Sequence, residues 1–167
     1  LKSDAKKSDT IADLFEILTD DNKDVRYKTQ DSLIKILNTV PKAALPELKR
    51  ALKDEDWRVV YHSIVILTEF ARKYPAPSVS LAPEVISAFN SGERLKERAA
   101  DCIGMLGLAN PDAMKPAVPG LIKGLESKSS ELRKASATAL GRIGSKNAMV
   151  VYHAVPSIEG AIKAANC

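Results

Sequence analysis

Apolar residues recur along the chain at the spacing of an amphipathic helix, and the same segment returns several times. Leu48 and Leu52 give one example of this spacing. Prolines mark four of the segments, 36 or 37 residues apart: Pro46, Pro83, Pro119 and Pro156. Because proline costs no backbone hydrogen bond in the first turn of a helix, each proline predicts the beginning of a helix. An earlier copy lacks the proline and keeps the spacing, so the chain reads as a repeat protein.

A second helical segment follows each of the first ones. Its two clearest copies, residues 95–107 and 132–144, align without a gap. One apolar column of the alignment contains Leu33, Leu67, Ile103 and Leu140. Another column contains only small residues: Thr29, Ser63, Ala99 and Ser136. A position that stays small predicts the close approach of a neighbouring helix.

Helix pairs of this kind cover their apolar faces by stacking on one another. The sequence therefore predicts an all-α solenoid of antiparallel helix pairs, a single domain over residues 1–167 with about four and a half repeats. The expected repeats are 9–39, 42–74, 79–109 and 112–145, followed by a terminal capping helix at 148–164.

The pattern resembles the HEAT-repeat family and is similar to the HEAT-like repeats of phycobilisome lyases. This resemblance implies a right-handed, armadillo-like superhelix whose second helices line the concave side. It also implies an Asp between the two helices and an Arg early in the second helix, which form polar contacts between repeats; Asp20 with Arg26 matches this motif. From their residue types, Asp20, Asp54, Asn90 and Ser127 are expected at turn or cap positions of the second helices.

Composition limits the classes of function without naming one. The net charge is +4 with a pI near 9.0, and the positive excess lies in residues 91–167. This bias is weaker than a dedicated nucleic-acid binder usually shows. Two cysteines are too few for a disulfide framework, and no apolar run approaches the length of a membrane helix. An intracellular, cytoplasmic location is expected.

No set of residues predicts catalysis. His62 and His153 lack the His–Glu pairs of iron-binding HEAT-like hydroxylases, and no zinc spacing or phosphate-binding loop is present. We therefore expect no cofactor and no enzymatic activity. Trp57 follows three acidic residues between two helices. It could belong to a tubulin-binding TOG-like array or to an alkylpurine DNA glycosylase-like cleft, but a packing role is favoured because acidic residues suit a helix N-terminus.

The leading hypothesis is a protein–protein interaction scaffold that binds a protein or peptide on the concave face. A nucleic-acid-binding protein is the alternative. The non-core columns of the second helices are expected to face the partner, and one of them reads Lys28, His62, Arg98 and Ala135. Tyr and Arg are enriched among interface anchors, and Trp57 is the single tryptophan. The candidate contact residues are Arg26, Tyr27, Trp57, Arg58, Tyr61, Arg98 and Arg142.

Overall fold

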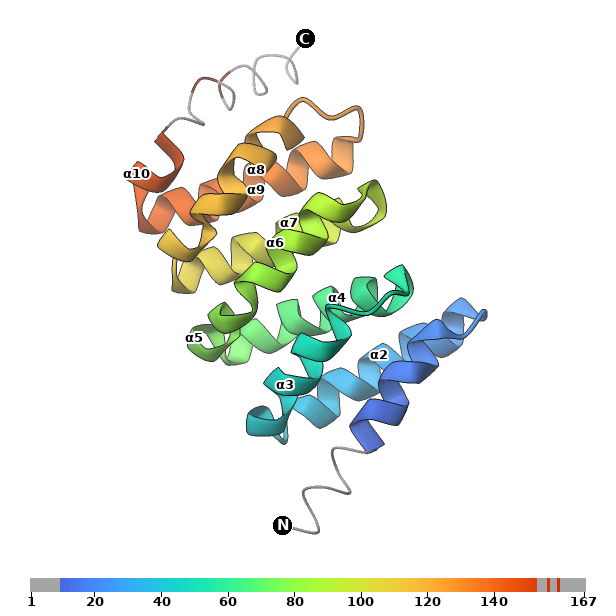
Figure 1. The fold of residues 1–167 in the computed structure, drawn as a ribbon. Coiled ribbons are helices and arrows are strands. Elements are labelled where there is room, and N and C mark those ends of the chain that lie inside the picture. Colours follow the sequence, from blue (N-terminus) through green and yellow to red (C-terminus); the bar gives the residue numbers. More distant parts are fainter. Residues whose placement is uncertain (1–9, 153–155, 157–158, 160–167) are drawn as a thin grey trace.

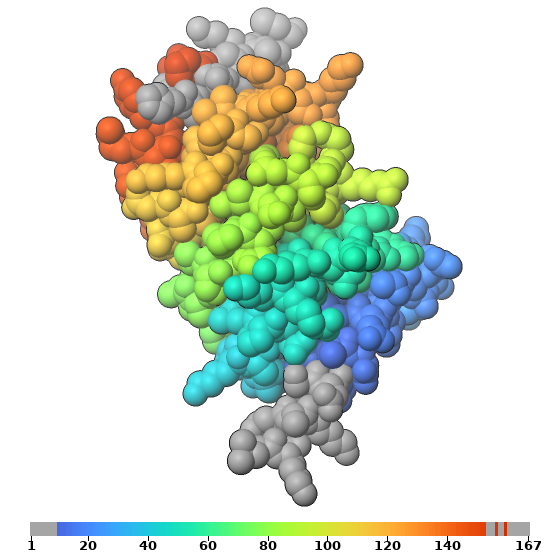
Figure 2. All heavy atoms as spheres, in the orientation of Figure 1, coloured from blue at the N-terminus to red at the C-terminus, as the bar shows by residue number. Residues whose placement is uncertain are grey.

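The protein is a stack of antiparallel helix pairs, seen in a computed structural model that describes residues 10–152, 156 and 159. Figure 1 shows the pairs following one another from the N-terminal to the C-terminal end, with the first helices in front and the second helices behind. Figure 2 shows the outer face formed by the first helices. The predicted all-α solenoid is therefore confirmed.

Four pairs are present in the described part of the chain. The first helices are residues 10–16 with the 3-10 turn η1 (Ile17–Thr19), then α3 (Pro41–Ala51), α6 (Ala82–Ser91) and α8 (Val118–Gly124). The second helices are α2 (Lys23–Leu37), α4 (Trp57–Lys73), α7 (Glu93–Ala109) and α9 (Ser130–Lys146). Short elements connect the later pairs: α5 (Pro75–Ser78), η2 (Val79–Leu81) and η3 (Asp112–Ala117).

A further helix, α10 (Ala148–Val151), follows α9 after Asn147. The side chain of Asn147 caps this helix by accepting a hydrogen bond from the backbone N–H of Met149 at 3.2 Å. Most of the capping helix predicted at 148–164 lies outside the described residues.

The prediction that every proline marks a first turn is wrong for Pro46. Pro83 and Pro119 lie in the first turn of α6 and α8, whereas Pro46 lies inside α3. This helix begins at Pro41, about one turn earlier. Pro41 and Pro46 both lack an N–H donor, but only Pro46 removes a hydrogen bond from the helix interior.

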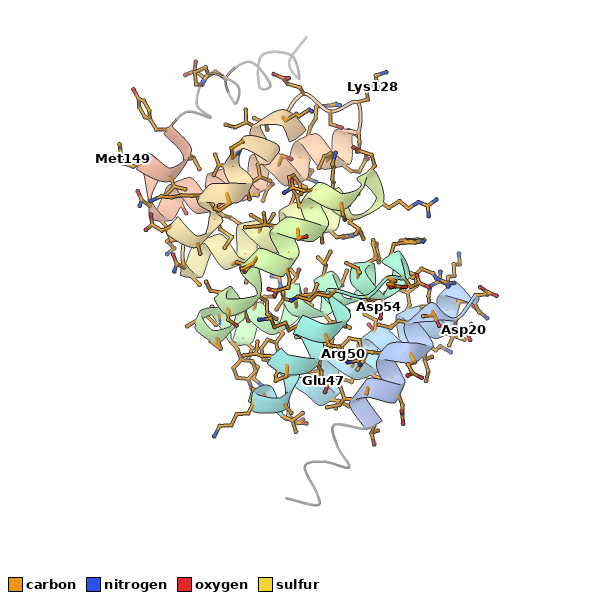
Figure 3. All side chains as sticks on the ribbon, viewed as in Figure 1. Asp20, Glu47, Arg50, Asp54, Lys128 and Met149 are labelled. Carbon is orange, nitrogen blue, oxygen red and sulfur yellow. The ribbon has the colours of Figure 1, made fainter. Side chains whose placement is uncertain are left out.

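The turns between first and second helices share one hydrogen-bonding scheme in three repeats. Asp20, Asp54 and Ser127 each accept a hydrogen bond from the backbone N–H two residues later, at 2.7, 2.8 and 3.2 Å. The residue that donates this bond is the actual N-cap: Asn22, Asp56 or Ser129. Asp20, Asp54 and Ser127 therefore stabilise the turn, and the residue that caps the second helix comes two positions later. Asp20, Asp54 and Lys128 mark this edge of the solenoid in Figure 3.

In two repeats an arginine side chain stabilises the turn by hydrogen bonds to its backbone. Arg26 donates to the carbonyl oxygens of Asp20 and Asp21, and Arg133 donates to those of Ser127 and Lys128. The expected Asp–Arg contacts between repeats are therefore replaced here by arginine contacts with the backbone of the same turn. One Asp–Arg ion pair does cross between repeats, at different positions from those expected: Arg58 Nη1 lies 3.2 Å from Asp21 Oδ1.

The core lies between the two layers, and Ser136 of the small column lies where α8 and α9 approach closely. Leu33, Leu67, Ile103 and Leu140 are all fully buried, as the alignment predicts. A Cβ on Gly124 of α8 would lie 2.2 Å from Ser136 Oγ on α9, so both positions must be small. One charged side chain also enters the boundary between repeats. Glu84 is 8% exposed, and Lys49 and Lys53 of the preceding repeat lie 3.6 and 3.5 Å from its Oε1.

Candidate functional site

The second-helix layer, formed by α2, α4, α7 and α9, is hollowed where three of its helices meet. The hollow has a volume of about 260 Å³ and an apolar floor at Val65. The remaining lining residues are polar or charged: Thr68, Glu69 and Arg72 from α4, Arg98 and Asp101 from α7, and Arg142 from α9. Two of the seven predicted contact residues, Arg98 and Arg142, lie here.

Beside the hollow, the side chains of three consecutive second helices form a connected group. Arg98 Nε of α7 donates a hydrogen bond to Tyr61 Oη of α4 at 3.2 Å. Tyr61 lies close enough to Tyr27 of α2 that the negative charge of an ionised Tyr61, followed by burial, raises the pKa of Tyr27 above 10.0. Tyr27 nevertheless remains 47% exposed. We call Tyr27, Tyr61 and Arg98 the tyrosine–arginine cluster.

His62 is buried beneath this cluster and packs against its two tyrosine rings. It is 3% exposed, and its ring makes edge contacts with Tyr27 and Tyr61 at centroid distances of 5.3 and 5.2 Å. Its Nδ1 lies 2.8 Å from Oε1 of the buried Gln30. The expected exposure of this column is therefore wrong at His62, and also at Ala135, which is 5% exposed. His62 faces α2, where Gln30 provides a polar partner for its ring.

Burial makes His62 a source of pH-dependent stability. Desolvation, followed by the positive charge of Arg26, lowers the pKa of His62 to about 4. In the unfolded chain its pKa is about 6.5, so the unfolded state binds more protons below that pH. The unfolding free energy is therefore expected to fall as pH drops from about 6.5 towards 4, by about 2 kcal/mol at pH 5. Urea denaturation at pH 7 and pH 5 measures this loss.

His62→Gln is the matched control because an amide can still bond Gln30 and does not titrate. The variant should show about 2 kcal/mol less pH dependence than the native chain over the same interval. An equal pH dependence in the two proteins would contradict the assignment of a buried neutral imidazole.

Trp57 and Arg58 lie at the edge of the layer, apart from the hollow. Trp57 is the first residue of α4, is 43% exposed, and has the guanidinium of Arg94 4.8 Å from its ring centroid. Because Arg94 belongs to the next repeat, the ring bridges two repeats, in agreement with a packing role. Arg58 makes several hydrogen bonds to Asp56 and holds the pKa of that carboxyl below its usual value. Arg94 had no sequence signal, since its partner lies 37 positions away.

The remaining predicted contact residues, Arg26 and Arg142, differ in whether their guanidinium groups already have partners. The guanidinium of Arg26 already donates hydrogen bonds to two carbonyl oxygens of its own turn. Arg142 makes no ion pair with any described residue, and its Cδ lies 3.3 Å from the position of a Cβ on Gly104. The structure thus brings Tyr27, Tyr61 and Arg98 together, places Arg142 across the hollow, and keeps Arg26, Trp57 and Arg58 at the turn edge.

Metal binding and thiol chemistry find little support among the described residues. They contain no group of three or more His, Cys, Asp or Glu side chains arranged to hold a metal ion. Cys102 is fully buried, and burial raises the pKa of its thiol to about 12, so the thiolate is not available as a nucleophile. None of the helices in this part of the chain has the length and apolar character needed to cross a bilayer.

Comparisons with known proteins agree with this architecture. Residues 93–143, which include α7 and α9, match the HEAT-like repeat family. A designed armadillo repeat protein in complex with the peptide (KR)4 is similar in structure, with a TM-score of 0.67, 16% identity, and coverage of 90% of this chain and 73% of that one. Computationally designed armadillo repeat proteins for modular peptide recognition give a TM-score of 0.66 at 17% identity, with the same coverage. A search of curated proteins found no match, so the likeness to phycobilisome lyases stays a prediction.

Proposed function

We propose that this chain is a non-enzymatic scaffold that binds a peptide segment of a protein partner along its second-helix layer. The observation that carries the proposal is the tyrosine–arginine cluster, which joins three consecutive repeats along the axis of the solenoid. An extended peptide follows such an axis, and each repeat then contributes one contact. The structurally similar designed proteins, which are described as peptide binders, support this mode of use.

The cluster has the physical properties of an interface anchor. Tyrosine offers a large contact area with few rotatable bonds, so little conformational entropy is lost on binding. The contacts of Tyr27 and Tyr61 with His62 already restrict both rings in the free protein. A surface held in its binding geometry before the partner arrives gains affinity because the ordering cost is smaller.

The arrangement of charges favours a protein partner over nucleic acid. Glu69 and Asp101 stand among the arginines of the hollow. A groove that follows a phosphate backbone needs uninterrupted positive charge, whereas a peptide groove can contain both signs. We propose no glycosylase-like activity, because Trp57 packs against Arg94 and the neighbouring Asp56 is bonded to Arg58.

A selection from a random dodecapeptide library on the immobilised chain tests this function. Peptides enriched by the native chain should bind Tyr27→Ala more weakly by about tenfold or more, because loss of an interface tyrosine typically costs 1–2 kcal/mol or more. Isothermal titration calorimetry measures the difference.

Tyr152→Ala provides the matched control, since Tyr152 is also exposed but lies next to α10, outside the second-helix layer. Its affinity for the selected peptides should equal that of the native chain. Circular dichroism checks that both variants remain folded. Equal affinity of Tyr27→Ala and the native chain for every enriched peptide would contradict the proposal.

A further inference from the structure

The hollow between α4, α7 and α9 is lined by charged side chains of both signs. Arginines from three successive second helices line it: Arg72, Arg98 and Arg142. Two carboxylates line it as well, Glu69 and Asp101. The positive groups are therefore in excess, and the question is which of them already has a partner.

Arg72 and Arg98 are partly neutralised by groups on their own helices. Arg72 Nε lies 3.2 Å from Glu69 Oε1. Arg98 Nη2 lies 3.8 Å from Glu97 Oε1. The pKa of Arg98 is raised chiefly by its hydrogen bond to Tyr61, and the charges of Glu97 and Asp101 add to this. Asp101 lies one helical turn after Arg98 and makes the smallest of these contributions. Arg142, on α9, remains as the cation of the hollow that makes no ion pair with a described residue.

Arg98 is also held in position by a hydrogen bond at Nε, which leaves its terminal Nη1 available. Its Nε donates to Tyr61 Oη, while Nη1 has no hydrogen-bond partner among the described residues. A guanidinium fixed at Nε presents its terminal N–H groups in a planar fork that matches the two oxygens of a carboxylate. Across the hollow, the aliphatic part of Arg142 rests on the bare backbone at Gly104.

We infer that the hollow takes the carboxylate side chain of an acidic peptide, held between Arg98 and Arg142. The inference rests on the proposed peptide-binding function and specifies the chemistry of its ligand. The ligand's aliphatic carbons would contact Val65, and the carboxylate oxygens would accept hydrogen bonds from the two guanidinium groups. Hydrogen bonds between a carboxylate and a guanidinium group become stronger when the two groups are removed from bulk water.

Three octapeptides of alternating sequence test the inference: (Glu-Ala)4, (Gln-Ala)4 and (Lys-Ala)4, each with a fluorescent label. Fluorescence anisotropy at low salt should show binding of (Glu-Ala)4 to the full chain about tenfold tighter than of (Gln-Ala)4, with (Lys-Ala)4 weakest. Arg142→Gln should lower the affinity for (Glu-Ala)4 about three- to tenfold, and Arg142→Lys by less, because it keeps the charge and loses the fork.

Lys134→Gln controls for net charge, since it also removes one positive charge from the exposed surface of α9 and lies outside the hollow. It should change the affinity less than twofold. Equal losses in Arg142→Gln and Lys134→Gln, preferred binding of (Lys-Ala)4, or no binding of (Glu-Ala)4 would each overturn the inference. If library-selected peptides bind through Tyr27 but are indifferent to Arg142→Gln, the inference fails while the proposed function stands.

Discussion

Leu140→Ala is expected to lower the free energy of unfolding by about 2–5 kcal/mol. Leu140 is fully buried in α9, at the position shared with Leu33, Leu67 and Ile103. Removing one methine and two methyl carbons loses their transfer free energy and leaves a cavity that rigid neighbouring helices fill only in part. Urea denaturation followed by far-ultraviolet circular dichroism measures the change.

Lys134→Ala serves as the control for this substitution, because Lys134 is exposed on the same helix. Its effect should stay within about 0.5 kcal/mol. Since stability in a repeat protein is a sum of repeat and neighbour terms, hydrogen exchange should show the loss of protection concentrated in α7 to α10. A loss below 1 kcal/mol for Leu140→Ala would contradict the packing described for α9.

Alanine at Gly104 and alanine at Gly141 are expected to have opposite effects, although these glycines occupy the same position in successive repeats. A Cβ at Gly104 would lie 2.9 Å from Ala139 Cα and 3.2 Å from Ala139 Cβ, so α7 and α9 would have to move apart. Overpacking of this kind costs about 1–3 kcal/mol. Thermal and urea unfolding should both show Gly104→Ala to be less stable than the native chain.

Gly141 is exposed, and apart from its chain neighbours and the backbone of its own helix no described atom lies within 4 Å of the position of its Cβ. Gly141→Ala should therefore raise the unfolding free energy by about 0.5–1 kcal/mol, because alanine loses less backbone entropy in a helix interior. The two variants are matched in chemistry and differ only in the neighbouring helix. A stabilising Gly104→Ala would show that the helices are not in close contact there.

Sequence periodicity identifies the buried apolar positions of this chain but does not identify which positions contact a neighbouring helix. The column containing Leu140 could be identified from the alignment, because burial of an apolar residue at the same phase of each helix is required by the repeat itself. Gly104 and Gly141 are indistinguishable in that alignment. Their difference depends on whether another second helix lies against them, which is a property of three-dimensional stacking.

In the candidate site, too, some features could be predicted from the alignment and others depend on how the helices stack. Tyr27 and Tyr61 could be proposed from their matching positions, and the structure places them together. His62 was expected on the exposed face and is buried, because its hydrogen bond to Gln30 allows a polar ring to fill the space between α2 and α4. Pro46 was expected at a helix start, but Pro41 provides an earlier start, and local proline rules do not decide between two such prolines.

The boundaries within the second-helix layer differ along the solenoid. Between α2 and α4 the space is filled by the rings of Tyr27 and His62, whereas between α7 and α9 the backbones at Gly104 and Ala139 nearly touch. Neighbouring helices separated by rings diverge more than helices separated by glycine. The two ends of the layer are therefore not interchangeable, so a peptide that binds as proposed would place its anionic side chain at the glycine-rich end and its apolar or aromatic side chains at the tyrosines.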